Sequence, residues 1–178
     1  SSMAGHIIAD YFEYKKRFKV ISINEEQIFN DQLDIDKSVL PEKADIVINS
    51  IRCLVDESNS FPSKAIIYNS YFPQFLFNLY SHARTKIIHL STDCIFSGKA
   101  GNYSEDYQHD GSSIYSKSRS LGEFYNNKDI IIRTSYIGPT LGSDREELFD
   151  WFLSQKESID GYSNALWKKM LLSKCWRN

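Results

Sequence analysis

The sequence predicts an α/β fold, a parallel sheet wrapped by helices on both sides. Two stretches, 45–51 and 86–90, are mostly apolar, which is typical of strands buried on both faces of such a sheet. Each ends abruptly in polar side chains, and stretches with helical spacing of apolar residues alternate with them. Because strands and helices alternate, we expect crossover connections and therefore parallel pairing.

Size and composition are those of one globular domain. The 178 residues allow a sizeable core, and 21 basic against 23 acidic residues give a net charge of −2, which indicates no nucleic-acid partner. Three scattered cysteines argue against a disulfide framework or a metal site and favour a reducing, cytoplasmic location. No apolar run reaches the roughly 18 residues of a membrane span, and no signal peptide is recognisable at the first residues.

The first half of the chain is expected to hold two helices and two strands. Apolar spacing predicts a helix over 3–16, and β-forming residues predict a strand over 18–23. The stretch 45–51 predicts a second strand. A long helix is predicted over 62–81, with Pro73 expected to kink or divide it.

The second half continues the alternation. A third strand over 86–90 precedes a loop over 97–113 that is rich in Gly, Ser, Asp and Asn. Helical spacing resumes over 113–126, a fourth strand follows over 129–133, and a further helix is expected over 143–155. Apolar and basic residues with helical spacing predict a short amphipathic helix over 166–178, whose expected place is on its own domain rather than on a membrane.

The stretch from Ile88 to Glu123 carries the candidate chemistry. The third strand ends in a hydroxyl pair and a carboxylate, and parallel strands deliver such groups to one edge of a sheet. Tyr115 opens the next helix, and Arg119 lies one turn on along the same face. The sequence therefore predicts a phenol and a fixed cation beside the strand-end hydroxyl of Thr92.

Several short motifs follow one another in this part of the chain. They are Ser91-Thr92-Asp93, Phe96-Ser97-Gly98, Tyr103-x-Glu105, Tyr115-x-x-x-Arg119, Leu121-Gly122-Glu123 and Ile132-Arg133-Thr134-Ser135-x-Ile137-Gly138. In this order they resemble the extended short-chain dehydrogenase/reductases. Most similar are the dTDP-4-dehydrorhamnose reductase-like sugar-nucleotide reductases of bacterial surface-polysaccharide synthesis.

This resemblance implies a Rossmann-like doubly wound parallel sheet. It also implies an enzyme that uses NADPH or NADH to reduce the 4-keto group of a 6-deoxy nucleotide sugar. In that reading Tyr115 protonates the developing alkoxide, and Thr92 hydrogen-bonds the carbonyl oxygen. Arg119 lowers the pKa of the phenol and holds the nicotinamide ribose. A phenol with an ordinary pKa of about 10 needs a nearby positive charge to exchange protons efficiently near neutrality.

The resemblance also implies binding contacts. Cofactor contacts are expected from Gly5, His6, Asn49, Ser50, Asn69 and Ser91, together with Tyr115 and Arg119. Substrate contacts are expected from Asp93, Phe96, Arg133 and Ser135. Alternatives stay open at single residues: Thr92 and Asp93 could order the strand-end turn, and Asn49 and Asn69 could satisfy buried backbone groups.

Three features depart from the family pattern. The family has lysine where this chain has Arg119, which keeps the charge but cannot release a proton. Of the family's G-x-x-G-x-x-G loop only Gly5 is matched, so the first strand is expected to be lacking. The third departure is a short carboxyl end. Residues 1–160 are assigned to the NAD(P)-binding domain, and residues 161–178 are expected to be a short divergent tail, a remnant of the family's substrate domain.

Two other functions remain open. A catalytically impaired relative could act as a binding or assembly subunit, which the three departures favour. An epimerase or dehydratase of the same superfamily would share the tyrosine and the cation. A homo-oligomer would help to cover exposed sheet edges. Glu25 and Glu26, after the predicted strand over 18–23, lean towards NAD, whereas the sugar cannot be read from the sequence.

Overall fold

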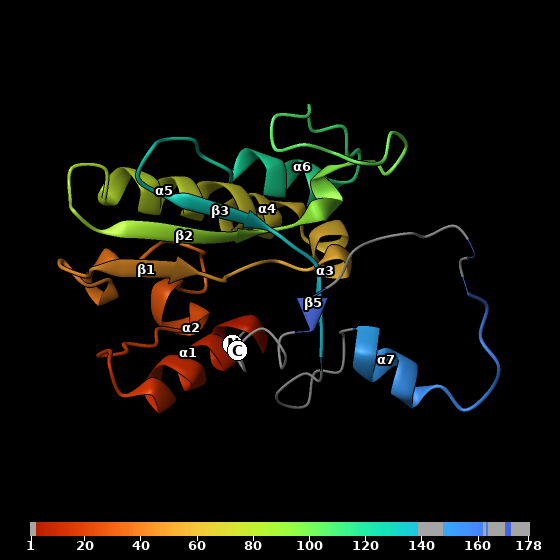
Figure 1. Ribbon diagram of the computed structural model, residues 1–178, viewed down its shortest axis with the longest axis horizontal. Coiled ribbons are helices and arrows are strands. Elements are labelled where there is room, and N and C mark those ends of the chain that lie inside the picture. The colour runs from red at the N-terminus through yellow and green to blue at the C-terminus, as the bar shows by residue number, and fades with distance from the viewer. Residues whose placement is uncertain (1–2, 139–147, 162, 164–169, 172–178) are drawn as a thin grey trace. The chain divides into compact units, whose positions relative to one another are not determined.

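A computed structural model describes residues 3–138, 148–161, 163 and 170–171 (Figure 1). The chain divides into two compact units. One consists of residues 23–133, and the other combines residues 1–22 with 134–178. The strand end and the helix that carry the candidate site both belong to the first of these units.

A parallel three-stranded sheet forms the centre of the 23–133 unit. Its strands are β1 (Ile46–Asn49), β2 (Lys86–Ser91) and β3 (Ile130–Arg133), in the order β1-β2-β3. The register pairs Asn49 with His89 and Ser91 with Arg133, so the carboxyl ends of the strands meet at one edge. The predicted α/β fold with a parallel sheet is confirmed, and so are three of its predicted strands.

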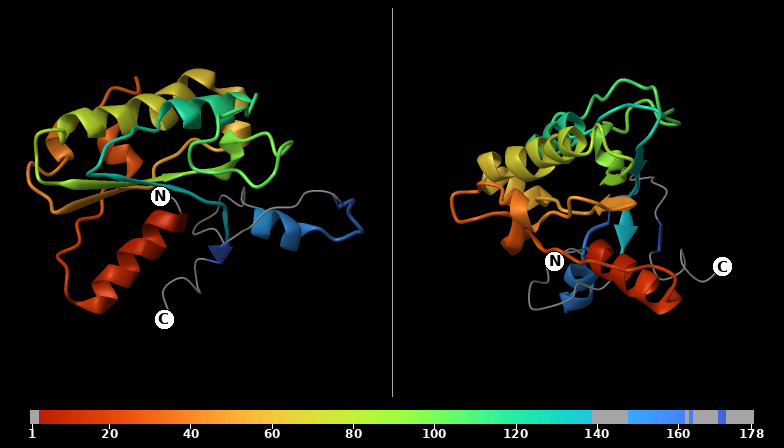
Figure 2. Two further views of the ribbon diagram at one scale, coloured as in Figure 1. Left: turned by 45° about the horizontal axis from the view of Figure 1, so that its top comes forward. Right: turned by 90° about the vertical axis from the view of Figure 1, so that its left-hand side faces the viewer.

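Helices cover one face of this sheet (Figure 2). The helical segments of the unit are α2 (Glu25–Ile28), η1 (Lys37–Val39), α3 (Val55–Ser60), α4 (Pro62–Ala65), η2 (Ile66–Tyr71), α5 (Phe72–Leu79), η3 (Asp93–Ile95) and α6 (Ile114–Leu121). On β2 the side chains of Ile87, His89 and Ser91 are buried, whereas Ile88 and Leu90 are only half-buried. Burial thus alternates along the strand, and the core lies on the helical side.

The helix predicted over 62–81 is present as a continuous run from Pro62 to Leu79. It is not broken at Pro73; instead the turns just before the proline widen into the π-helical segment η2. Proline has no N–H to donate to the carbonyl four residues earlier, so a regular α-helical bond from Pro73 to Asn69 cannot form. The widened turn accommodates this loss while keeping the helix intact.

The helix predicted over 113–126 is shorter than expected. Ser113 is its N-cap, and the hydroxyl of Ser113 accepts the backbone N–H of Ser116 at 3.0 Å. The helix α6 ends at Leu121, with Gly122 as its C-cap. Beyond it, the Gln74 side chain donates to the carbonyls of Leu121 and Glu123, at 3.1 and 2.8 Å. These bonds satisfy the end of α6 from a different helix.

The strand predicted over 18–23 is wrong, because these residues adopt neither strand nor helix. A strand needs a neighbouring edge for its backbone groups, and the described sheet pairs β1 with β2 only. The residue that follows, Asn24, instead caps α2. The side-chain oxygen of Asn24 accepts from Gln27 N at 3.0 Å, and the side-chain oxygen of Gln27 accepts from Asn24 N at 2.9 Å.

The other unit begins with α1 (Met3–Lys15), which confirms the first predicted helix. A two-residue parallel pair joins β4 (Tyr136–Ile137) to β5 (Met170–Leu171). The helix α7 (Leu148–Ser154) falls within the predicted 143–155, whose first five residues lie outside the described residues. The helix expected over 166–178 is wrong at Met170 and Leu171, which form a strand, and its other residues lie outside the described part.

Candidate functional site

The candidate site lies where β2 ends beneath α6 (Figure 1). Thr92 follows the last residue of β2 and is buried. Its hydroxyl accepts the backbone N–H of Cys94 at 3.2 Å and so caps the 3-10 turn η3. This turn packs against α6. The capping role that the sequence left open for Thr92 is therefore present, and it holds the hydroxyl beside the helix that carries Tyr115.

Tyr115 and Arg119 lie one turn apart on α6, as their spacing predicts. Both are buried, with 7% and 2% of their surface exposed. The guanidinium Nη2 of Arg119 donates a short hydrogen bond to the carbonyl of Leu90, which ties α6 to the end of β2. The phenol of Tyr115, by contrast, makes no hydrogen bond with any residue that the structure describes.

The charge of Arg119 acts on a buried histidine. His89 is fully buried on β2, where its Nδ1 lies 3.1 Å from the side-chain amide nitrogen of Asn49. Burial, and then the nearby charge of Arg119, lower the pKa of His89 to about 3. The imidazole is therefore neutral at physiological pH. Arg119 supplies a positive charge next to the carboxyl end of β2.

Two asparagines predicted to line the cofactor pocket hydrogen-bond the loop between β1 and α3. The side-chain oxygen of Asn49 accepts from Ile51 N at 3.1 Å. Asn69 accepts from Cys53 N at 2.9 Å and donates to Cys53 O and to Ser118 Oγ, both at 3.1 Å. Both side chains are buried, so the structure matches the alternative in which they satisfy backbone groups.

A buried carboxylate, Glu123, links β2 and β3. It accepts from Ser91 Oγ at 2.5 Å, from Tyr125 at 2.9 Å and from Arg133, whose Nη2 lies 2.8 Å away. Burial alone would raise the pKa of Glu123, but the bonds from Arg133 and Ser91 outweigh it and hold the pKa below its ordinary value. Two of the quoted motifs, Leu121-Gly122-Glu123 and Ile132-Arg133, therefore meet in one ion pair.

The same arginine also fixes the loop over 97–113. Arg133 Nη1 donates to the carbonyl of Glu105 at 2.7 Å, and Nη2 lies 3.0 Å from His109 Nε2. Its guanidinium stands over the ring of Phe96, 5.5 Å from the centroid, and Phe96 stacks on Tyr103 at 4.4 Å. The predicted substrate residues Phe96 and Arg133 thus contact each other and hold this loop in place.

The remaining predicted residues are distributed as follows. Ser50 comes directly after β1, and Asp93 opens η3 with its carboxylate 3.5 Å from the hydroxyl of Thr92. Gly5, His6 and Ser135 belong to the other unit. There Gly5 lies within the first turn of α1, and His6 pairs with Asp10 at 3.1 Å.

Sequence reasoning gave no role to Glu123, His89 or His109. Two signals in the sequence mark two of these residues. Glu123 belongs to the motif Leu121-Gly122-Glu123, and His89 is the one polar residue within the apolar run of β2. The partner of His109, Ser120 Oγ at 2.7 Å, depends on tertiary packing, which no local pattern encodes. No cluster of three metal-ligating side chains occurs among the residues that the structure describes.

The donors expected to hold a dinucleotide fit that group only in part. In the 23–133 unit Asn49, Asn69, Ser91 and Arg119 are all buried and bonded to groups of the unit itself. Tyr115 is the predicted cofactor contact of this unit whose polar group is not committed to a described neighbour. The asparagines, Ser91 and Arg119 therefore shape the sheet edge, while Tyr115 has a hydroxyl available for a ligand.

Comparison with known proteins adds sequence and structural relatives. Residues 5–159 match the family model described as the RmlD substrate binding domain. The spore coat polysaccharide biosynthesis protein SpsK of Bacillus subtilis is 30% identical over 156 residues, which cover 84% of this chain and 55% of that protein. The chain therefore spans about half the length of this curated relative.

Solved structures agree on the fold. A dTDP-4-dehydrorhamnose reductase from Clostridium acetobutylicum superposes with a TM-score of 0.67 at 25% identity, over 79% of this chain and 53% of that one. A hypothetical dTDP-4-dehydrorhamnose reductase from Sulfolobus tokodaii gives 0.66 at 24%, over 78% and 55%. Other structures of this fold contain NADP, NADPH or NAD. Within the described residues, no helix has the length and apolar character needed to cross a membrane.

Proposed function

Because the chain belongs to the RmlD substrate binding domain family, we propose that it takes part in the NAD(P)H-dependent reduction of a 4-keto-6-deoxy nucleotide sugar. The product would serve the synthesis of a bacterial surface polysaccharide. The relative SpsK is named for such a pathway, and the similar solved structures are named as dTDP-4-dehydrorhamnose reductases.

The observation that supports this proposal is the hydrogen bond from Arg119 to the carbonyl of Leu90. It fixes α6 against the end of β2, and the packing of η3 on α6 then keeps Thr92 beside the helix of Tyr115. In the proposed reaction Thr92 hydrogen-bonds the ketone oxygen and Tyr115 donates a proton to it. Arg119, one turn further along α6, holds a positive charge on the same helix and contacts the end of β2.

The cofactor, NADPH or NADH, would supply the hydride. Tyr115 is the residue of this unit that would contact it with an uncommitted hydroxyl, and Ser50 lies at the neighbouring strand end. Within the other unit, taken by itself, Gly5 and His6 lie near the amino end of α1, where backbone N–H groups favour anions such as phosphate.

A second candidate function is that of a non-catalytic binding or assembly subunit. It is favoured by the position of Arg119, whose guanidinium is buried and bonded to the sheet. A cation held there stabilises the junction of α6 and β2 whether or not a cofactor binds. In this alternative the protein keeps the family fold because its surface binds a partner, and it does not catalyse the reaction.

Titration with NADH and NADPH, followed by assays with 4-keto-6-deoxy nucleotide sugars, tests the two candidates. A reductase should bind one dinucleotide saturably and consume it only when the sugar is present. Tyr115→Phe should lower turnover by about two orders of magnitude or more while dinucleotide affinity is retained. Tyr71→Phe removes the same hydroxyl at an exposed position of a different helical segment and serves as the matched control.

The outcomes separate the candidates cleanly. Turnover that disappears in Tyr115→Phe but survives in Tyr71→Phe would eliminate the non-catalytic subunit. A folded protein that binds neither dinucleotide would eliminate the reductase. Product stereochemistry adds a third readout, because an epimerase of the same superfamily would invert a carbon without net consumption of the dinucleotide.

A further inference from the structure

A dense group of cations marks the end of α1 and the residues that follow. Lys15 is the last residue of the helix, and Lys16, Arg17 and Lys19 come directly after it. All four are exposed, and no described carboxylate forms an ion pair with any of them. Like charges at this spacing repel one another, so an anionic surface facing them would relieve an unfavourable interaction.

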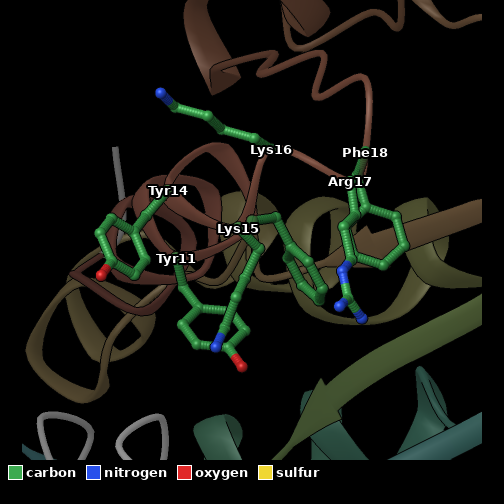
Figure 3. A pocket seen from close by; sticks show the side chains of 7 residues that line it. Tyr11, Tyr14, Lys15, Lys16, Arg17 and Phe18 are labelled. Carbon is green, nitrogen blue, oxygen red and sulfur yellow. The ribbon is translucent and has the colours of Figure 1, made fainter.

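Exposed aromatic rings accompany these cations. Tyr14 and Phe18 expose 79% and 55% of their surface. Phe18 meets the ring of Phe12 edge-on at 5.0 Å, and Tyr11 meets Phe12 at 5.4 Å. The aromatic and basic side chains surround an open hollow of about 730 Å³ (Figure 3). Large rings left in water are unfavourable unless another apolar phase receives them.

The backbone positions the two kinds of side chain together. Lys16 has a φ of 51°, a left-handed conformation that ends the helix and turns the chain. Lys15 remains on α1, and its amine lies 5.2 Å from the centroid of Tyr11. In Figure 3 the side chain of Lys16 extends away from the rings, while Arg17 lies beside Phe18. The amine of Lys15 stands over the ring of Tyr11, whereas the rings of Tyr14 and Phe18 remain exposed beside the other cations.

Favourable charges at a helix end do not account for this cluster. A cation in the last turn stabilises the carboxyl end of a helix, and Lys15 already occupies that position. Lys16, Arg17 and Lys19 lie beyond the helix, where the effect of the helix dipole falls off. An average protein surface also mixes the two signs of charge, whereas the only acidic residue in 11–19 is Glu13.

We propose that the cluster formed by residues 11–19 docks on a membrane surface rich in anionic phospholipids. Cations near such a surface meet lipid phosphates, and tyrosine and phenylalanine rings enter the boundary between headgroups and acyl chains. A single interface thus explains both the unpaired charges and the exposed rings. The protein would lie on the membrane reversibly, and the proposal does not depend on the proposed reductase activity, because no proposed active-site residue belongs to the cluster.

Flotation of the full chain with lipid vesicles tests this directly. Vesicles that mix phosphatidylglycerol with phosphatidylcholine should carry the protein, and pure phosphatidylcholine should not. Each Lys or Arg near an anionic surface contributes about fivefold to binding, so the double variant Lys16→Gln/Arg17→Gln should bind about 25-fold more weakly. Tyr14→Ser/Phe18→Ser should also bind more weakly, while its remaining binding keeps the dependence on salt.

The control is Lys37→Gln/Lys43→Gln, which removes the same charge from exposed positions of the other unit. It should bind as the unchanged protein does. Equal loss in this control would mean that net charge alone governs binding and would overturn the proposal. Equal binding to pure phosphatidylcholine would overturn it as well, and so would tighter binding to a single-stranded oligonucleotide than to anionic vesicles.

A salt series on the unchanged protein keeps the test valid if a variant fails to fold. Binding through lipid phosphates should weaken steeply as salt screens the charges. Binding that is insensitive to salt would contradict the proposal without any variant. None of these readouts uses dinucleotide or sugar, so failure here leaves the proposed reductase activity untouched.

Discussion

The carbonyl oxygen of Asn69 lies against the α-carbon of Gly122, so closely that a β-carbon at residue 122 would stand 1.9 Å from it. Asn69 belongs to the π-helical segment η2, and Pro73 cannot donate a hydrogen bond to its carbonyl. Gly122 ends α6 with an ordinary φ of −79°, so its backbone conformation does not require glycine. Packing alone requires it, and α6 can approach η2 only with hydrogen at that position.

Gly122→Ala is therefore expected to destabilise the protein by about 3 kcal/mol, because the new methyl group must push α6 away from η2. The urea midpoint should fall accordingly. The control is Gly161→Ala, since a β-carbon there meets nothing within 4 Å. Equal midpoints for Gly122→Ala and the unchanged protein would show that the two helices are not packed as described.

The neutral, buried His89 should make the protein sensitive to mild acid. Its pKa in the folded state is about 3, against about 6.5 when exposed, so below about pH 6.5 the unfolded chain takes up a proton that the folded chain refuses. Stability is therefore expected to fall by about 2 kcal/mol between about pH 6.5 and about pH 5. Urea unfolding at several pH values measures this slope.

His89→Gln keeps a group that can face Asn49 but cannot titrate. We expect it to be less stable than the unchanged protein at neutral pH and to show a flatter dependence on pH. The exposed His82 provides the control, and His82→Gln should leave the slope as it was. A slope that persists in His89→Gln would mean that another group takes up the proton.

Glu123→Gln should cost about 3 kcal/mol near neutrality, because it removes the counter-ion of Arg133 from a buried site. The difference in unfolding free energy between Glu123→Gln and the unchanged protein should become smaller in acid. Since the pKa of Glu123 is depressed in the folded state, its stabilisation is present above about pH 4.5 and is lost as pH falls through the lower folded value. Glu105→Gln, at an exposed side chain, should change little at any pH.

Arg119→Met should weaken both the fold and the proposed reaction. The Leu90 carbonyl would lose a charged donor, which costs about 2 kcal/mol. If the protein is a reductase, turnover should fall more in Arg119→Met than in Arg119→Lys, because lysine keeps the charge. Lys117→Met, at an exposed position of the same helix, should alter neither stability nor turnover. Stability loss with unchanged turnover would mark Arg119 as purely structural.

Much of the fold could be predicted because its signals are local. The apolar runs of β1 and β2 and the apolar spacing of α1 and of the helix over 62–81 each specify an element over a few residues. The spacing of Tyr115 and Arg119 placed them one turn apart for the same reason. The strand over 18–23 failed because pairing depends on a neighbouring edge, which a stretch of β-forming residues does not itself provide.

The inner structure of the site could not be predicted, because it depends on partners far apart in sequence. Asn69 reaches Cys53 and Ser118, and Glu123 reaches Ser91 and Arg133. The polar residue types indicate that these side chains need hydrogen bonds, but they do not indicate which residues are the partners. For that reason the sequence does not indicate that Asn69 bonds the loop before α3 or that Glu123 pairs with Arg133.

The widened turn of η2 also bears on how the chain folds. The bonds of Asn69 join positions 16 and 49 residues apart, and the parallel strands β1 and β2 also pair residues far apart in the chain. This junction can therefore form only after distant segments have met. Interactions made late in folding act mainly on the rate of unfolding. The packing of η2 against α6 should therefore slow unfolding. A variant that loosens this packing should unfold faster, while its folding rate stays nearly unchanged.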